Sequence, residues 1–245
     1  MSDSFAESLA RRDRALTLAG LVVLTVLAWL YLLRLGREMA DMAEMGMAHT
    51  EPWTVTDAGL AAVMWAVMMV AMMLPAAAPM ILVFATVNRK RREAPGTAPY
   101  VNTTLFVLAY LVVWGAFSAA AALAQWGLHS AALLSEDAMQ AAPLAGGLLL
   151  AAAGIYQLTP LKYACLARCQ TPIGFLLSEW RDGNRGAFVM GLRHGLFCLG
   201  CCWVLMTLLF VGGVMNLVWV AAIAAFVLLE KLLPAGRLVS VISGG

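Results

Sequence analysis

Long apolar runs that carry almost no charge are the sequence feature that most constrains the fold of this chain. Residues 16–33 form such a run, and the whole chain is 62% hydrophobic and 12% charged. Soluble domains carry roughly 45–50% apolar and about 25% charged residues. In lipid, every backbone polar group must be satisfied within the protein, which an α-helix achieves along its own length. We therefore expect an all-α polytopic membrane helical bundle, with residues 1–245 forming a single membrane domain.

The apolar runs and the polar stretches between them predict about six transmembrane helices. The first run ends at Arg34 without a small-residue cleavage site, so we interpret it as a retained helix and not as a cleaved signal peptide. Pro75 and Pro79 lie inside the second run, where each proline removes a backbone hydrogen bond and can kink the helix. The predicted helices cover residues 16–33, 57–87, 100–124, 143–161, 186–210 and 215–233.

Basic residues between the predicted helices indicate an orientation, because Lys and Arg concentrate on the cytoplasmic side of a membrane protein. With the N-terminus inside, the outer segments hold only Arg34 and Arg37. We therefore predict cytoplasmic N- and C-termini, a Met-rich outer segment at 38–56 and a cysteine-bearing inner segment at 162–185. The basic residues of the inner segments are Arg11, Arg12, Arg14, Arg89, Lys90, Arg91, Arg92, Lys162, Arg168, Arg181, Arg185, Lys231 and Arg237.

The stretch 193–203 holds three of the five cysteines together with a histidine, inside a predicted transmembrane helix. His194, Cys198 and Cys202 are spaced by four residues, which places them on one helical face. Such residues in an apolar segment point to a site, although a buried cysteine can also serve as a small hydrophobic packing residue.

A second cysteine pair, Cys165 and Cys169, follows the fourth predicted helix at the same spacing of four. The two groups can form one site only if segment 162–185 folds back into the bundle, where irregular backbone must be surrounded by protein. Pro172, Gly174 and Gly183 allow such a re-entrant turn. The predicted metal ligands are Cys165, Cys169, His194, Cys198, Cys201 and Cys202.

Thiolates with one imidazole suit soft or borderline ions, so the candidates are copper(I), zinc or an iron–sulfur cluster. The same cysteines could instead perform thiol–disulfide chemistry, passing electrons between a quinone and a thiol partner. Cys198 and Cys201 have the CxxC spacing that occurs in redox and zinc motifs, whereas Cys165 and Cys169 are spaced by four residues. We assign no catalytic residue and no site for an organic cofactor.

Methionines supply a second set of soft ligands, because thioethers select copper(I) and remain competent in an oxidising compartment. In the outer segment they form a possible copper collector, or one face of an interfacial helix. In the second predicted helix they form a stripe at i, i+4 and i+8, which is also typical of packing. The secondary candidates are Met39, Met42, Met45, Met47 and His49 outside, and Met64, Met68 and Met72 in the helix.

Other polar residues within the apolar segments are expensive in lipid and therefore need partners. We predict an ion pair between Arg193 and Glu230, an interfacial position for Lys231, and a helix-capping role for Asn216. The chain has no phosphate loop, nucleophile elbow, HExxH or dinucleotide fingerprint, so soluble-enzyme chemistry has no support.

Several blocks of the sequence resemble a bacterial family of uncharacterised integral membrane proteins that is predicted to bind metal. The resemblance runs from about residue 57 to the C-terminus, and the cysteine blocks are its most specific part. It implies a multi-pass protein of the bacterial cell inner membrane with a metal site, without defining a substrate or a ligand set. The blocks are 65–75 (WAVMMVAMMLP), 156–169 (YQLTPLKYACLARC), 191–195 and 201–203 (GLRHG and CCW), 212–216 (GGVMN) and 230–231 (EK).

The sequence thus predicts an integral membrane protein that binds a soft metal ion, for which copper is the leading candidate. Its predicted role is metal handling, transfer, or insertion into a membrane metalloprotein. The expected partners are the lipid bilayer and a membrane metalloenzyme or metallochaperone, and no nucleic acid. The alternatives are a membrane thiol or metal redox protein, or a structural subunit of a larger membrane complex. The sequence favours a role without enzymatic turnover.

Overall fold

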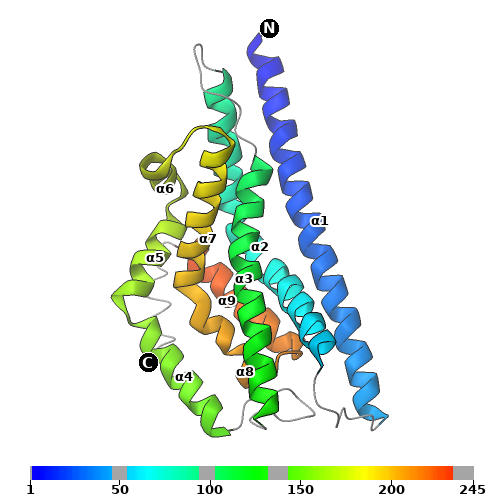
Figure 1. The fold of residues 1–245 in the computed structure, drawn as a ribbon. Coiled ribbons are helices and arrows are strands. Elements are labelled where there is room, and N and C mark those ends of the chain that lie inside the picture. The colour runs from blue at the N-terminus through cyan, green and yellow to red at the C-terminus, as the bar shows by residue number, and fades with distance from the viewer. Residues whose placement is uncertain (1, 46–53, 94–102, 132–142, 234–245) are drawn as a thin grey trace.

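The computed structural model describes residues 2–45, 54–93, 103–131 and 143–233, and within these ranges the chain is helical, without a strand. The predicted all-α bundle is confirmed (Figure 1). The helices are α1 (Ser2–Glu44), α2 (Val55–Glu93), α3 (Thr103–Ser130), α4 (Pro143–Gln157), α5 (Pro160–Gln170), α6 (Pro172–Glu179), α7 (Gly183–Thr207), α8 (Leu209–Gly212) and α9 (Leu217–Leu232).

Four helical stretches of the described chain are long and apolar enough to cross a membrane, namely Arg14–Met42, Val55–Arg91, Thr103–Ser130 and Gly183–Gly212. Helices α4 and α5 add a fifth crossing if the pair, which is bent by 66°, counts as one span. The sixth predicted segment is helical, but α9 has only 16 residues. At 1.5 Å per residue its length is about 24 Å, short of the roughly 30 Å hydrocarbon core. The described residues thus contain four or five candidate spans, against the six that the sequence predicts.

Helix α1 extends well beyond the predicted range of 16–33, to Glu44. Arg34 and Arg37 do not end it, because charged residues with long side chains are good helix formers outside the hydrocarbon core. The Arg34 Nε lies 2.9 Å from the Glu38 Oε1, one turn further on, which supports the helix there. The first part of the Met-rich outer segment is therefore helical.

The predicted irregular turn at 162–185 is instead two short helices, α5 and α6, joined to α7 by a brief connection. Thr159 caps α5 by accepting a hydrogen bond from the backbone N–H of Lys162, and Pro160 occupies its first turn. Pro172 likewise occupies the first turn of α6. Proline is favoured in the first turn of a helix and prevents a preceding helix from continuing through it, so the sequence divides this segment into short pieces. The segment nevertheless folds back, since α5 packs along α7.

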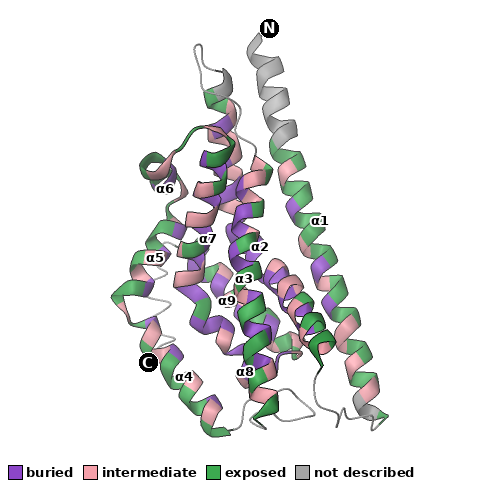
Figure 2. Ribbon diagram, viewed as in Figure 1, coloured by how far each residue is buried: buried purple, intermediate pink, exposed green. Residues whose placement is uncertain are grey.

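Helix α7 lies in the interior of the bundle and packs on α3, α5, α4 and α9. Two glycines allow its close approach to α3. A Cβ on Gly195 would lie 2.8 Å from Val113 Cγ2, and a Cβ on Gly191 would clash with the Phe106 carbonyl oxygen. Small residues at such positions let membrane helices approach closely. Buried residues concentrate on α2, α3 and α7, whereas α1 and α4 present mostly exposed side chains (Figure 2).

Candidate metal centre

The cysteines of α7 lie in the dry interior of the bundle. Cys198, Cys201 and Cys202 are fully buried, and His194 is 2% exposed. The predicted face of His194, Cys198 and Cys202 is therefore directed into protein. Because the glycines of α7 bring it against α3, these side chains are surrounded by neighbouring helices and not by lipid.

Helix α5 brings the second cysteine pair to α7. Cys169 is buried, and its side chain interacts electrostatically with those of Cys198 and Cys201. Cys165, one turn earlier on α5, is partly exposed and lies beside Gly200, where a Cβ would come within 2.7 Å of the Cys165 Sγ. The bent α4–α5 pair thus places both cysteine groups in one region of the bundle.

Cys198 is the most highly contacted of these sulfurs. The Lys231 ammonium donates a 2.8 Å hydrogen bond to its Sγ, and the Tyr110 hydroxyl lies 3.2 Å from the same atom. Tyr110 also lies 3.0 Å from the Met73 carbonyl oxygen, to which it donates. A positive donor stabilises negative charge on sulfur, and the thiolate is the form that binds metals. The predicted interfacial position of Lys231 is wrong, because α9 is short and its last turn ends inside the bundle.

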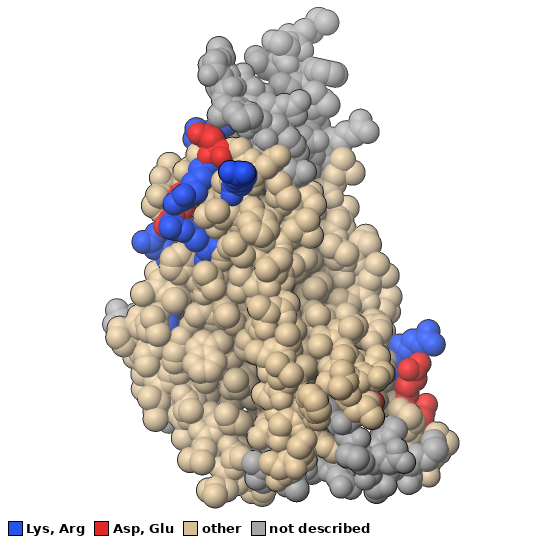
Figure 3. Space-filling view, in the orientation of Figure 1, with Lys and Arg blue, Asp and Glu red and all other residues tan. Residues whose placement is uncertain are grey.

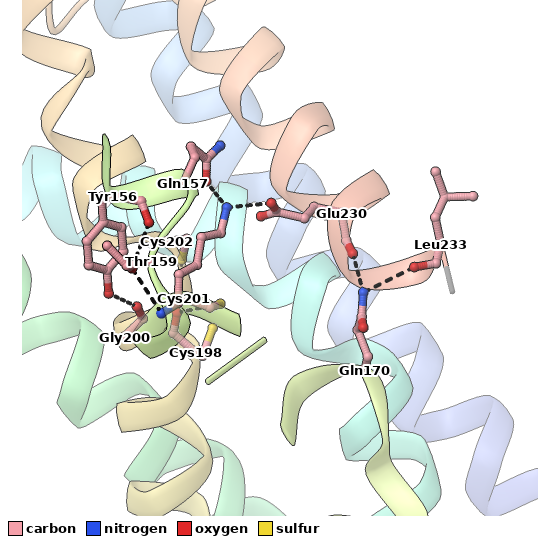
Figure 4. A network of polar contacts seen from close by, with 11 residues as sticks. Tyr156, Gln157, Thr159, Gln170, Cys198, Gly200, Cys201, Cys202, Glu230 and Leu233 are labelled. Atoms are coloured by element: carbon pink, nitrogen blue, oxygen red, sulfur yellow. Dashed lines mark hydrogen bonds and ion pairs between the residues drawn. The ribbon is translucent and has the colours of Figure 1, made fainter. Parts of the chain in front are cut away.

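A buried charge network adjoins the cysteines. Lys162, in the first turn of α5, pairs with Glu230 of α9 and donates to the Gln157 side-chain oxygen, both shown in Figure 4. The Lys162 and Glu230 side chains are essentially inaccessible, and buried charges persist only when they are paired. The predicted Arg193–Glu230 ion pair is therefore wrong. The break before Pro160 turns Lys162 inward to Glu230.

Arg193 instead pairs with Glu179, the last residue of α6. This contact connects the N-terminal half of α7 to α6 at the edge of the bundle. The basic side chain that contacts Cys198 is therefore that of Lys231, and Arg193 is occupied by Glu179.

His194 lies one turn before Cys198 and is enclosed by aromatic rings. Its ring centroid lies 5.7 Å from those of Tyr110 and Phe175, and 6.0 Å from that of Phe106. Its Nδ1 has no hydrogen-bond partner within the described part of the chain. A buried polar atom without a partner costs free energy, which a bound cation would recover. His194 therefore has the chemistry of a ligand, and the ring contacts that hold it are with aromatic side chains.

The side chains as they stand do not form a closed metal cage. Among the described residues, no three His, Cys, Asp or Glu side chains are placed to hold one metal ion together. The Cys201 and Cys202 thiols each lie 3.0 Å from the Cys198 carbonyl oxygen and donate to it. These are local contacts that a side-chain rotation releases. The donor set suits Cu(I), which prefers soft sulfur and accepts few ligands, better than zinc, which takes a closed tetrahedral shell.

The predicted methionine stripe is buried on α2. Met64, Met68 and Met72 are all nearly inaccessible. The methionine that reaches the cysteines is the next residue, Met73, whose Sδ lies 3.9 Å from the Cys202 Sγ.

The outer methionines lie at the C-terminal end of α1. Met39 and Met42 are half-buried there, and Met45 is 62% exposed. Met47 and His49 lie outside the described residues.

Met190 and Met206 are two further buried residues that sequence reasoning did not select. They continue the spacing of four that joins His194, Cys198 and Cys202, so extending that spacing in both directions would have found them. Lys231 and Tyr110 were missed because their proximity to Cys198 depends on how α9 and α3 pack.

A helical membrane protein with soft ligands buried between its helices is the class that this fold and this cluster define. The family model of PpoB2, described as a copper chaperone, matches residues 62–245, which is more than half of the chain. The chain therefore belongs to the PpoB2 copper chaperone family, and its predicted copper-handling function is confirmed. The match includes every cysteine and the α2 methionines, whereas the whole of α1 precedes it. No curated protein and no solved structure shows significant similarity to the chain.

Proposed function

We propose that the protein receives Cu(I) among its buried cysteines and transfers it to a copper-receiving partner. The observation that carries this proposal is the packing of α5, which holds Cys165 and Cys169, along the cysteine-bearing helix α7, where Cys165 lies beside Gly200. Two helices far apart in the sequence supply soft sulfur atoms to one dry region, where few alternative ligands compete. The proposed ligand set is Cys165, Cys169, His194, Cys198, Cys201 and Cys202.

Cys165 differs from the other cysteines because it alone is partly exposed, whereas the others are buried. Metal transfer between proteins proceeds by ligand exchange, which requires one ligand that both sites can reach. We assign this exchange role to Cys165, with Cys169 one turn further inward on the same helix. A partner sulfur or imidazole could approach Cys165 while the inner cysteines still hold the metal.

The proposed orientation places the N-terminus on the cytoplasmic side of a bacterial inner membrane. Lys and Arg gather near α6 and the adjoining ends of α5 and α7, with a smaller charged group towards the end of α1 and a broad uncharged belt between them (Figure 3). This asymmetry agrees with the positive-inside rule. The predicted cytoplasmic C-terminus rests on Arg237, which lies outside the described residues, and it requires the chain from α9 onwards to complete a further crossing. In this orientation Met39, Met42 and Met45 face the outer compartment and can collect copper.

The proposed copper-receiving partner is a membrane metalloenzyme in its metal-free form, or a metallochaperone. Zinc and iron–sulfur binding remain as outcomes of the same experiment. The partner's docking site is expected near Cys165, because this sulfur is the accessible end of the cluster.

The test is the Cu(I) content of protein purified in detergent under anaerobic conditions, compared with Cys198→Ser and Cys169→Ser variants. We expect wild type to bind copper and each variant to lose most of it. Met80→Leu is the matched control, since it removes a buried soft ligand of α2 two turns beyond Met73. Cysteine variants that keep their full copper content would overturn the proposal. Zinc or iron in place of copper would redirect it to another metal.

A thiol-alkylation gel shift, run with and without reductant, addresses the redox alternative. A copper chaperone should show fully reduced cysteines throughout its cycle. A disulfide that forms and breaks in stoichiometric amounts would support redox turnover instead.

A further inference from the structure

The buried cysteines of α7 belong to a longer file of soft side chains. Its members follow one another every four residues, and all are buried: Met190, His194, Cys198, Cys202 and Met206. On a helix of about 3.6 residues per turn, each step of four rotates the file by roughly 40°. The file therefore winds around α7, so that it meets α3 at one end and α2 further along.

The contacts follow this rotation. His194 packs on the rings of Phe106 and Tyr110, both from α3. Two turns later, the Cys202 Sγ lies 3.9 Å from the Met73 Sδ of α2. Both sulfur-bearing residues are fully buried.

Met73 is held in this position by its neighbours. Its carbonyl oxygen accepts a 3.0 Å hydrogen bond from the Tyr110 hydroxyl, which also lies 3.2 Å from the Cys198 Sγ. Tyr110 thus connects the backbone of Met73 to Cys198, which lies one turn before Cys202. Met69, one turn earlier on α2, is also buried, so thioethers continue away from the cysteines on this side.

We propose that Met73 and Cys202 form a mixed thioether–thiolate Cu(I) site, through which copper passes between the α2 methionines that precede Met73 and the inner cysteines. The proposal rests on the proposed function, which it extends by a specific ligand pair. Cu(I) binding replaces the Cys202 thiol proton, which is released, and uses a lone pair of the neutral Met73 sulfur. Thioether and thiolate sulfur together are the donors that select Cu(I) over harder ions. The metal keeps its oxidation state throughout.

The first test compares Cu(I) binding and release in wild type, Met73→Leu, Cys202→Ser and the double variant, by competition with a chromophoric Cu(I) chelator. Leucine has nearly the volume of methionine and no ligand atom, so packing is conserved. We expect Met73→Leu to weaken binding at one copper equivalent by about tenfold, the order expected when a metal site loses one supporting group. The double variant should match Cys202→Ser, because both changes disable the same site. Met80→Leu is the matched control and should bind as wild type does.

The second test detects the copper ligand directly and uses Met73→Leu only as the comparison. Protein whose methionines are replaced by selenomethionine is loaded with Cu(I), and X-ray absorption at the selenium edge should detect a copper neighbour that the Met73→Leu variant lacks. A selenium-edge spectrum of the copper-loaded protein that shows no copper neighbour overturns the proposal. Unchanged copper binding in Met73→Leu, with loss in Cys198→Ser, overturns it too and leaves the proposed function intact. Full copper retention in every cysteine variant would instead remove the proposed function itself.

Discussion

The ammonium group of Lys231 donates a 2.8 Å hydrogen bond to the sulfur of Cys198, and this contact joins the last turn of α9 to the middle of α7. The preceding residue, Glu230, pairs with Lys162 at the start of α5. Consecutive side chains of α9 therefore reach both helices that carry the cysteines. The charge of Lys231 acts on the candidate metal centre, whereas the charge of Glu230 holds the α4–α5 break in place.

Replacing Lys231 with Leu, which has no ligand atom, should weaken Cu(I) binding at the cysteine cluster. The variant removes a charge-assisted hydrogen bond to the Cys198 sulfur, and such bonds contribute about 1.5–3 kcal/mol. If the thiolate depends on this bond, the dissociation constant should rise by about tenfold or more. Chelator competition measures the change, and Lys231→Arg, which keeps a positive donor, is the control. Equal affinity of the Leu variant and wild type would show that Lys231 does not tune the site.

Breaking the Lys162–Glu230 pair should destabilise the fold more than removing both charges together. Glu230→Gln leaves the Lys162 ammonium buried without its counter-charge, a situation that typically costs about 3–5 kcal/mol. Replacing both residues with Met should recover much of that loss, because no unpaired charge remains. Thermal unfolding in detergent, followed by circular dichroism, gives the ranking.

The exposed Arg34–Glu38 pair supplies the control for this ranking. Arg34→Gln is expected to leave the unfolding temperature unchanged, because solvent screens exposed pairs. A Glu230→Gln variant as stable as the double Met variant would show that the unpaired Lys162 ammonium carries no penalty, which would contradict this ranking.

The helical face of the site could be predicted from the sequence, whereas its partners could not. The spacing of His194, Cys198 and Cys202 identified their common face because the helical period is fixed. Met72 and Met73 differ by about 100° around α2, and only the packing of α2 near α7 selects Met73. Thr159 and Pro160 marked the start of a helix, but the 66° bend between α4 and α5 depends on tertiary contacts.

The depth of α9 is a further property that its sequence alone did not settle. Glu230 and Lys231 close an apolar run, which is typical of a membrane interface. The helix has 16 residues, and its final turn lies beside Cys198 inside the bundle. Asn216 was predicted correctly as a cap, since its side chain accepts a hydrogen bond from the Trp219 N–H, a local contact that needs no tertiary information.

Copper affinity should increase with pH, and the slope should depend on the cysteines. Each thiol that becomes a ligand releases a proton, so a rise in pH favours the metal-bound form. Chelator competition at several pH values, corrected for the chelator's own protonation, measures how many protons leave per copper. Cys202→Ser should release fewer protons than wild type, whereas Met73→Leu should release the same number because a thioether carries none. An identical proton count in Cys202→Ser would show that this thiol is not a ligand.

Gly200→Ala should impair copper exchange through Cys165. A Cβ at Gly200 would lie 2.7 Å from the Cys165 Sγ, so the sulfur must move away from its present position beside α7. If Cys165 is the exchange ligand, copper release to an external chelator should slow while the amount bound by the inner cysteines stays the same. Gly147→Ala is the matched control, since no atom lies within 4 Å of its added Cβ. Stopped-flow release rates provide the measurement, and equal rates for both variants and wild type would remove Cys165 from the transfer path.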